Sequence, residues 1–418
     1  MTKDGSTLRV LALMEATTVS GPAKNLIEFC RRARTLDPLP SGAPAFEISI
    51  ATFHRGPADG GSNDGGGPAR GANGEAPNLF VAAARAAGVT VDVIPERFRF
   101  DPRVVSELRR VVARRAPDII QSHQIKSHFL VKLAGLWRER PWIAFHHGYT
   151  ATDLKMQLYN RLNRWSLPTC DRVVTVCEAF ARQLTAREGV RPERIAVRHN
   201  SIKADGFTAA RGGDEARRLR ERHGVKEGER VVLAIGRLSR EKGHADLITA
   251  LGQLRRARPD IDFKLLVVGE GPERPRVERI AADEGVTDRV VFVGQVGDVR
   301  PYYAAADVLA LPSHSEGSPN VLLETMAAGV PAVAAAVGGV PEIATHEKTA
   351  LLVAPRDTAA MAESLARVLS DARLAGELAA NASALVSADY SPEAYARSLF
   401  GIYRELAGGG RGKPGRAA

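Results

Sequence analysis

Residues 311–334 read LPSHSEGSPNVLLETMAAGVPAVA: the end of one apolar run, a loop, a helix with start and stop signals, and a second apolar run. Ser318 followed by Pro319 predicts the helix start, because a serine hydroxyl can cap the first helix amides and proline suits the first helical position. Gly329 ends the predicted helix. A strand on each side of one helix is the repeating unit of a parallel α/β sheet.

Short apolar runs alternate with amphipathic helical stretches along almost the whole chain. Such runs are typical of strands in a parallel sheet that helices cover on both faces. Each half has enough units for its own doubly wound sheet, so the sequence predicts an α/β protein with two domains of this type. The predicted strands span residues 8–14, 46–52, 89–95, 118–122, 142–147, 172–177, 194–200, 230–236, 263–269, 289–294, 307–313, 331–336 and 350–355.

The domain boundary is expected where the last strand of the first half gives way to a charged helical stretch. We place the first domain at 1–205, the second at 206–388, and a terminal helix at 389–407. Two segments rich in Gly and Pro, 56–77 and 408–418, should lack fixed structure, because they cannot bury enough apolar area to offset their ordering entropy.

The composition indicates a cytoplasmic protein. The only cysteines are Cys30, Cys170 and Cys177, whose spacing suits neither a disulfide framework nor a zinc site. The first apolar run is interpreted as a strand and not as a signal peptide. No stretch reaches the roughly 18–20 apolar residues that a bilayer-spanning helix needs.

The formal net charge of +10 leaves several partner classes open. Nucleic acid, an anionic membrane surface and a phosphorylated substrate would each suit a basic protein. Arginines concentrate around one predicted helix in the first half, and the alternative is that this helix face is simply solvated. Aromatic residues are not interleaved with the basic ones, which argues against nucleic acid. The arginines of this helix are Arg103, Arg109, Arg110, Arg114 and Arg115.

A basic loop follows the first strand of the second half, in AIGRLSREKGH (234–244). In an open α/β sheet, ligands bind beyond the carboxyl ends of the strands, where this loop should lie. Arg237 offers a planar fork of donors and Lys242 a compact charge, which together suit a diphosphate. The alternative is a solvated basic loop.

The predicted helix after Pro319 offers free amides from Asn320 and Val321 onward, which form an anion site. Glu316 lies just before this site and Glu324 lies inside the helix. A carboxylate beside a phosphate site would repel the anion unless it binds neutral hydroxyls, so the pattern indicates a phosphorylated sugar. The alternative is that both glutamates only complement the helix dipole.

These motifs resemble those of the retaining glycosyltransferases of the GT-B fold called glycosyl transferases group 1. The resemblance rests on the spacing of Glu316 and Glu324, on the loop GRLSREKG (236–243) and on AVGGVPE (336–342). It is specific over about 231–353 and looser in the first half. It implies two Rossmann-like domains that face each other across a cleft, and a nucleoside-diphosphate sugar as donor.

By this resemblance, Arg237 and Lys242 would bind the donor diphosphate. Glu316 would contact hydroxyls of the transferred sugar, and Glu324 the ribose hydroxyls. Turns around Gly269 and Val296 would line the nucleotide pocket. The segment facing the sugar and phosphates would consist of Ser318, Pro319, Asn320 and Val321.

In the first half, the turn SGPAK (20–24) resembles a glycine turn near the donor phosphates, with Gly21 as its matching residue. The strand ending AFHHGYT (144–150) resembles the segment with a histidine near the anomeric carbon. We assign that role to His147, with His146 as the alternative.

Asn200 matches the family's domain junction, whereas Ser201 and Lys203 depart from it, so Lys203 is given no role. His123 and His128 are interpreted as structural residues. The segment 389–406 resembles a terminal helix that crosses back over the first domain.

The resemblance implies transfer with retention of anomeric configuration, with His147, Glu316, Arg237 and Lys242 as the catalytic group. Cationic side chains and a helix N-terminus can stabilise the leaving diphosphate electrostatically, so no metal and no cofactor are predicted. The only Asp-x-Asp triplet, at 260–262, precedes a strand and would lie at the opposite edge of the sheet. No pair of hydrolytic carboxylates is evident.

The expected acceptor is a saccharide or a lipid-linked molecule, with peripheral contact to an anionic membrane as a further expectation and no nucleic-acid partner. A nucleotide-sugar epimerase or a phosphorylase of the same architecture, and a non-catalytic nucleotide-sugar-binding protein, are the alternatives. An epimerase would need no second substrate.

Overall fold

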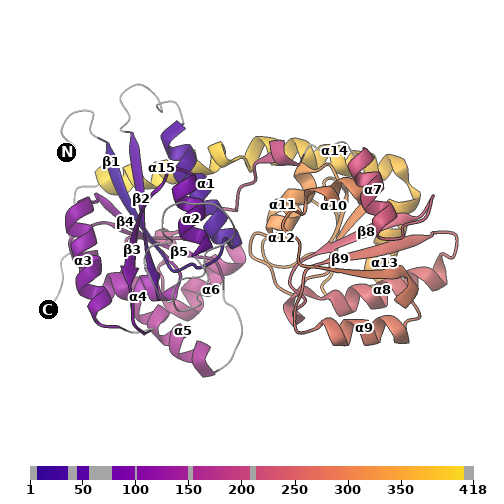
Figure 1. Cartoon of the computed structure of the whole chain (residues 1–418), viewed down its shortest axis with the longest axis horizontal. Helices are drawn as coiled ribbons and strands as arrows, with labels where there is room; N and C mark the ends of the chain where they lie inside the picture. The colour runs from indigo at the N-terminus through magenta and orange to yellow at the C-terminus, as the bar shows by residue number, and fades with distance from the viewer. Residues whose placement is uncertain are drawn as a thin grey trace, which may run out of the picture. The chain divides into compact units, whose positions relative to one another are not determined.

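The computed structural model describes residues 7–35, 45–55, 78–98, 101–148, 154–207 and 213–408 (Figure 1). The expected loop at 56–77 lies outside these residues. The expected tail also lies outside them, except for Gly408, which is the last residue of a helix. The chain divides into two compact units, one of Met1–Arg198 with Pro392–Ala418 and one of His199–Ser391.

The first unit is built on a seven-stranded parallel sheet with the order β3-β2-β1-β4-β5-β6-β7. Its strands are β1 (Leu8–Met14), β2 (Phe46–His54), β3 (Thr90–Pro95), β4 (Ile119–His123), β5 (Trp142–His146), β6 (Arg172–Thr175) and β7 (Ile195–Val197). Its helices are α1 (Gly21–Thr35), α2 (Leu79–Ala86), α3 (Arg103–Arg115), α4 (Ile125–Leu133), α5 (Leu154–Ser166), α6 (Glu178–Glu188) and α15 (Pro392–Gly408).

Side chains of β1 alternate between two apolar cores, one on each face of the first sheet. Val10 and Ala12 pack with α1, α2 and α15, whereas Leu11 and Leu13 pack with α3 and α4. Successive strand residues point to opposite faces, so a strand buried on both faces must be apolar throughout. This is why β1 has no polar-apolar alternation.

The second unit is built on a six-stranded parallel sheet with the order β10-β9-β8-β11-β12-β13. Its strands are β8 (Arg230–Ile235), β9 (Phe263–Val268), β10 (Val290–Gly294), β11 (Val308–Leu311), β12 (Ala332–Ala335) and β13 (Leu351–Val353). Its helices are α7 (Asp214–Arg222), α8 (His244–Ala257), α9 (Arg274–Asp283), α10 (Arg300–Ala305), α11 (Asn320–Ala327), α12 (Val340–Ile343), α13 (Thr358–Ser370) and α14 (Ala372–Asp389).

Helices cover both faces of the second sheet (Figure 1). One core contains residues of α8, α9 and α13, and the other contains residues of α7, α10, α11 and α12. The strand order reverses between β8 and β11, so the loops after these two strands meet at a switch point, where open α/β sheets bind ligands. Every strand range predicted from the sequence contains a strand, and the predicted α/β class is confirmed.

The second unit begins before the expected boundary at 205/206. The amide of Ile202 donates to the carbonyl of Tyr390 at 2.9 Å, and Ile202 and Phe207 pack into a core of the second unit. These contacts place the junction segment with the second unit.

The arginines of α3 form ion pairs with carboxylates of the first unit. Arg114 and Arg115 both bind Asp92, at 2.8 and 2.7 Å, and Arg109 binds Glu139 at 2.8 Å. Arg103 and Arg110 likewise pair with neighbouring carboxylates. The basic run in the sequence is therefore a helix whose charge is largely balanced.

Replacing Gly269 by alanine should destabilise the second unit. Its φ is +136°, and a Cβ atom there would lie 2.0 Å from the carbonyl oxygen of Gly236. We expect Gly269→Ala to lower the free energy of unfolding by about 2–4 kcal/mol in urea titrations. Gly376→Ala is the control, because Gly376 is helical and a Cβ there meets nothing within 4 Å. The control should be neutral or stabilising by up to about 1 kcal/mol, and an unchanged Gly269→Ala would contradict the argument.

Candidate functional site

The loop after β8 is shaped by Gly243 and packs against the loop after β11. Gly243 has φ +67°, and a Cβ atom there would lie 2.0 Å from the carbonyl oxygen of Pro312. Only glycine allows this conformation and this approach together. The turn places Lys242 beside the β11 loop, while Arg237 is exposed earlier in the same segment.

Lys242 and Glu316 form an ion pair across the switch point. The ammonium Nζ lies 2.8 Å from Glu316 Oε1, and the hydroxyl of Ser313 donates to the same oxygen at 2.7 Å. Glu316 is 8% exposed. A buried carboxylate needs such partners, because an uncompensated buried charge costs several kcal/mol. The structure therefore brings together two residues that the sequence assigned to the same site.

Gly338 lies directly against the backbone of Glu316. Its φ is +54°, and a Cβ atom there would lie 1.7 Å from the Glu316 carbonyl oxygen. This contact gives AVGGVPE a structural reason, since the loop that carries Glu316 requires glycine at this position. The sequence indicated the motif but not the role of Gly338, and it missed Ser313 entirely.

The predicted cap of α11 is wrong by one residue. The helix begins at Asn320, Pro319 occupies the cap position with extended ψ of 114°, and no described side chain caps it. The Ser318 hydroxyl instead accepts from the amide of Asn200 at 2.8 Å. Proline has no N–H, so the amides from Asn320 onward are the first that this helix end presents.

Asn200 holds the loop before α11 in place. Its side-chain amide donates to the Ser318 carbonyl at 2.7 Å and to Asn320 Oδ1 at 2.9 Å. Asn200 thus contacts the segment that the sequence assigned to the donor. Its role is to hold the backbone of this segment in position.

Glu324 lies in the second turn of α11 and binds a buried tyrosine. The hydroxyl of Tyr303 donates to Glu324 Oε2 at 2.9 Å. Burial and the adjacent Glu324 charge raise the pKa of Tyr303 well above its usual value, so the phenol stays protonated and remains a donor. Sequence reasoning missed Tyr303, because no local pattern links α10 to α11.

Gly269 and Val296 lie near the end of β9 and after β10. The Gly269 amide donates to the carbonyl of Gly294 at 2.9 Å, and Val296 packs against the apolar core. A Cβ atom at Gly271 would lie 2.2 Å from the carbonyl oxygen of Leu238. The turn after β9 therefore packs closely on the loop that carries Arg237.

The aspartates of the Asp-x-Asp triplet precede β9 and bind arginines. Asp260 pairs with Arg258 at 2.7 Å, and Asp262 pairs with Arg289. Across the described ranges, no group of three or more His, Cys, Asp or Glu side chains is placed to hold a metal ion.

In the first unit, His147 follows β5 and contacts His123 at the end of β4. The distance from His123 Nδ1 to His147 Nε2 is 3.4 Å, and the rings are nearly parallel at 10°. Burial lowers the pKa of His147 to about 4, and it lowers that of His123 well below its usual value. His123, interpreted from the sequence as structural, is thus in contact with the predicted site histidine.

His146 and His128 lie deeper in the unit. His146 is 5% exposed, and burial followed by the nearby His147 lowers its pKa to about 3. His128 lies 2.7 Å from the Ser122 hydroxyl, which also accepts from the indole of Trp142. Of the two candidate histidines, His147 is the less buried.

Gly21 is the first residue of α1, and the amide of Lys24 donates to the Ser20 carbonyl at 2.8 Å. The SGPAK segment is thus the start of a helix after β1. It lies at the switch point of the first sheet, between β1 and β4.

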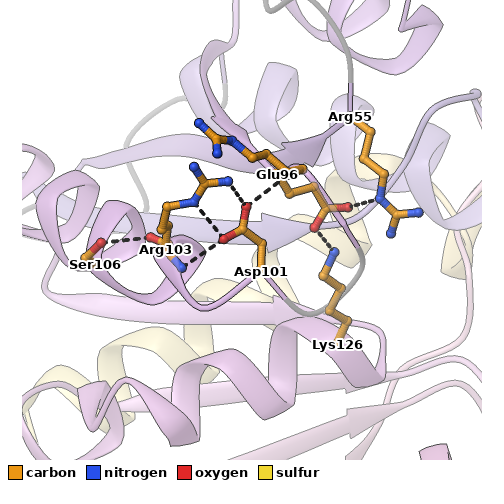
Figure 2. Close-up of polar contacts among 7 residues, drawn as sticks. Arg55, Glu96, Asp101, Arg103, Ser106 and Lys126 are labelled. Atoms are coloured by element: carbon orange, nitrogen blue, oxygen red, sulfur yellow. Dashed lines mark hydrogen bonds and ion pairs between the residues drawn. The ribbon is translucent and has the colours of Figure 1, made fainter.

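Charged residues follow four neighbouring strands of the first sheet at their carboxyl ends. Lys126 binds Glu96, and Glu96 also accepts from Arg55 at 3.0 Å (Figure 2). Lys126 Nζ lies 3.4 Å from Glu15 as well. Lys126 and Glu96 are buried, so this network joins the ends of β1, β2, β3 and β4. Sequence reasoning did not identify it.

Comparison with known families decides what these two sheets belong to. Residues 215–384 match the family described as Glycosyl transferases group 1, and residues 46–201 match the Glycosyl transferase 4-like domain. The chain belongs to the group 1 glycosyltransferases. The resemblance seen in the sequence is confirmed.

Two curated relatives with different names align with this group 1 member. The chain is 34% identical over 225 residues to 2-deoxystreptamine glucosyltransferase of Streptomyces kanamyceticus, which is 53% of this chain and 57% of the relative. It is 26% identical over 313 residues to N-acetyl-alpha-D-glucosaminyl L-malate synthase of Bacillus anthracis, which is 73% of this chain and 80% of the relative. The chain thus spans less than two thirds of the first of these relatives.

Solved structures show the same fold. HepE of Anabaena, solved in complex with UDP, superposes with a TM-score of 0.77 at 20% identity over 96% of this chain and 100% of HepE. Sucrose-phosphate synthase of Thermosynechococcus elongatus superposes with a TM-score of 0.71 at 21% identity, over 96% of this chain and 99% of that one. The predicted GT-B class, with two Rossmann-like sheets, is confirmed.

None of the helices in the described part of this group 1 member has the length and hydropathy that crossing a bilayer requires.

The buried and half-buried histidines of the first unit should make its stability sensitive to acid. Their pKa values are depressed in the folded state, to about 3 for His128 and His146 and about 4 for His147, so the unfolded chain binds more protons as the pH falls from about 6.5 towards 4. The free energy of unfolding should therefore decrease over this interval, by about 1.4 kcal/mol per pH unit for each such histidine. Urea titrations at a series of pH values measure this slope.

The control is His147→Gln, which removes one titrating group. It should reduce the slope of the free energy of unfolding against pH by about 1.4 kcal/mol per pH unit. A free energy of unfolding that stays constant between pH 6.5 and 4.5 would contradict the assignment of neutral buried histidines.

Proposed function

We propose that this protein is a metal-independent, retaining glycosyltransferase that moves a sugar from a nucleoside-diphosphate sugar to a saccharide or lipid-linked acceptor. The observation that carries the proposal is the meeting of Lys242, Glu316 and the start of α11 at the switch point of the second sheet. A cation, a hydroxyl-binding carboxylate and a helix N-terminus are the groups that a sugar diphosphate needs.

Lys242, Arg237 and the amides from Asn320 would stabilise the leaving diphosphate. Negative charge builds up on this group as the glycosidic bond breaks, and fixed donors stabilise that charge without reorganisation. A helix N-terminus adds a partial positive charge and free N–H groups. These residues would supply what a divalent metal supplies in other transferases.

Glu316 would bind hydroxyls of the transferred sugar. One carboxylate oxygen, Oε1, already accepts from Lys242 and Ser313. Among the described residues, the structure assigns no hydrogen-bond partner to Oε2, which is the oxygen offered to a sugar hydroxyl. Glu324, in the second turn of α11, is held by the hydroxyl of Tyr303. Its carboxylate would bind the ribose hydroxyls.

The first unit would supply the acceptor side and His147. Because burial keeps His147 neutral at physiological pH, it would donate or accept hydrogen bonds near the anomeric centre and would not carry charge there. The diphosphate oxygen would then take the acceptor proton. The charged network around Lys126 lies at the carboxyl edge of this sheet, where a polar acceptor would bind.

Removing either phosphate-binding cation should lower turnover. Lys242→Ala and Arg237→Ala are each expected to reduce kcat/KM by roughly 10²–10³, the loss seen when one preorganised charge stabiliser is removed. The assay follows acceptor-dependent release of nucleoside diphosphate, which also separates transfer from epimerisation.

Arg240→Ala is the matched control, because Arg240 is an exposed arginine of the same loop with no assigned contact to the donor. It should stay within a few-fold of the parent. Equal kcat/KM values in all three variants and the parent would refute the phosphate assignment.

Chelators should leave transfer intact. If Lys242, Arg237 and the α11 amides stabilise the diphosphate, excess EDTA should change kcat/KM less than twofold, as measured with the same release assay. A loss of activity that added Mg²⁺ restores would show that a metal is needed for leaving-group departure.

A further inference from the structure

A line of hydrogen-bonded side chains runs through the interior of the first unit and ends at His147. The hydroxyl of Tyr403 on α15 binds Gln121 Oε1 on β4. Gln121 Nε2 lies 2.6 Å from His123 Nε2, and His123 Nδ1 lies 3.4 Å from His147 Nε2. Tyr403, Gln121 and His123 are all buried. None of the three was identified as functional from the sequence.

The direction of these bonds is set at Tyr403. Its side chain is 0% exposed, so its hydroxyl proton must find an acceptor inside the protein. Among the described residues, the one hydrogen bond of this hydroxyl is to Gln121 Oε1. Reversing the amide would leave a buried O–H donor facing an N–H₂ group, which costs the desolvation of an unsatisfied donor. The amide of Gln121 therefore presents its N–H₂ group to His123.

This orientation determines the tautomer of both histidines. An amide N–H₂ group only donates, so His123 Nε2 must be unprotonated and accept. Neutral His123 then carries its proton on Nδ1 and donates it to His147 Nε2. His147 in turn must carry its proton on Nδ1. Burial, which depresses the pKa of both rings, keeps them neutral as this pattern requires.

The position of His123 is itself fixed from the neighbouring helix. The hydroxyl of Ser127 donates to the carbonyls of His123 and Gln124. One residue earlier, Lys126 is bound by Glu96 (Figure 2) and Glu15. The buried ion pair thus holds the start of α4 beside the end of β4, and the Ser127 hydrogen bond fixes the backbone of His123.

We infer that Tyr403, Gln121 and His123 are positioning residues that hold His147 as the Nδ1–H tautomer, so that His147 serves as a hydrogen-bond donor to an oxygen of the substrate and not as a base. The inference rests on the proposed function, in which His147 contacts the donor sugar. A donor at this place would stabilise charge developing on a sugar or phosphate oxygen. With its proton on Nδ1, His147 would also not act as a competing base near the anomeric carbon.

The tautomer can be observed directly by long-range ¹H–¹⁵N correlation spectra of the full chain labelled with ¹⁵N-histidine. In the parent protein, we expect Nδ1 of His147 to be protonated and Nε2 to be unprotonated, with the signals assigned by their loss in His147→Gln. Tyr403→Phe removes the bond to Gln121 Oε1, and Gln121→Met removes both bonds that Gln121 makes. Both should give signals of mixed tautomers at His147.

The same variants should lower kcat about 10-fold with the donor KM within about twofold, because they disturb orientation and leave the diphosphate site intact. Tyr395→Phe is the matched control, since Tyr395 is another tyrosine of α15 that packs against Phe29 and takes no part in the line. It should leave both the spectrum and kcat unchanged.

Two outcomes would overturn the inference: His147 protonated on Nε2 in the parent, or an unaltered His147 spectrum in both Tyr403→Phe and Gln121→Met. The spectra require no turnover, so they separate this inference from the proposed function. If the parent protein shows the expected tautomer and His147→Gln keeps full activity, the line of hydrogen bonds is supported. The role of His147 in transfer is then refuted.

Discussion

The ion pair between Lys242 and Glu316 fixes the carboxyl edge of the second sheet at its switch point. It joins the loops after β8 and β11, which are the two that meet where the strand order reverses. Glu316 could not be buried without a cation and a hydroxyl beside it, because the desolvation of a lone carboxylate is too costly. A bound diphosphate would compete with Glu316 for Lys242. Under the proposed function, donor affinity would therefore reflect the exchange of one anion for another around the Lys242 ammonium group.

Backbone conformations at a few glycines make this arrangement possible. Gly243 lets the β8 loop touch Pro312, and Gly338 lets its own loop touch Glu316. Side-chain hydrogen bonds add to these backbone contacts. Asn200 binds the segment before α11, and Tyr303 binds Glu324. Close main-chain approach and these side-chain hydrogen bonds thus hold the site together with the Lys242–Glu316 ion pair. Arg237, in the same loop as Lys242, is exposed and has none of these fixing contacts assigned among the described residues.

The strands of the second unit were predictable, because apolar runs are local signals. Glu316 and Glu324 were predictable as candidate site residues, because their spacing is also a local signal. Apart from the meeting of Lys242 and Glu316, contacts between distant segments were not predictable. Nothing near Ser318 indicates that its hydroxyl serves Asn200 and not the helix, and nothing near His123 indicates contact with His147. The arginines of α3 show the same limit, since the sequence cannot reveal that Asp92 and Glu139 balance them. The junction at 199–207 shows this limit too, because its anchor, the Tyr390 carbonyl, lies far along the chain.

The helix α15 belongs to the core of the first unit although it follows the second unit in the chain. Phe400 stacks on Phe46 with ring centroids 4.0 Å apart, and Tyr403 reaches Gln121 in the same interior. During synthesis the ribosome must therefore deliver the entire second unit before the first can close its own interior. Until then, the surface that α15 will cover stays open to solvent and to chaperones, and the second unit can mature first. Completion of the first unit's core therefore waits for a helix that follows the second unit in the chain.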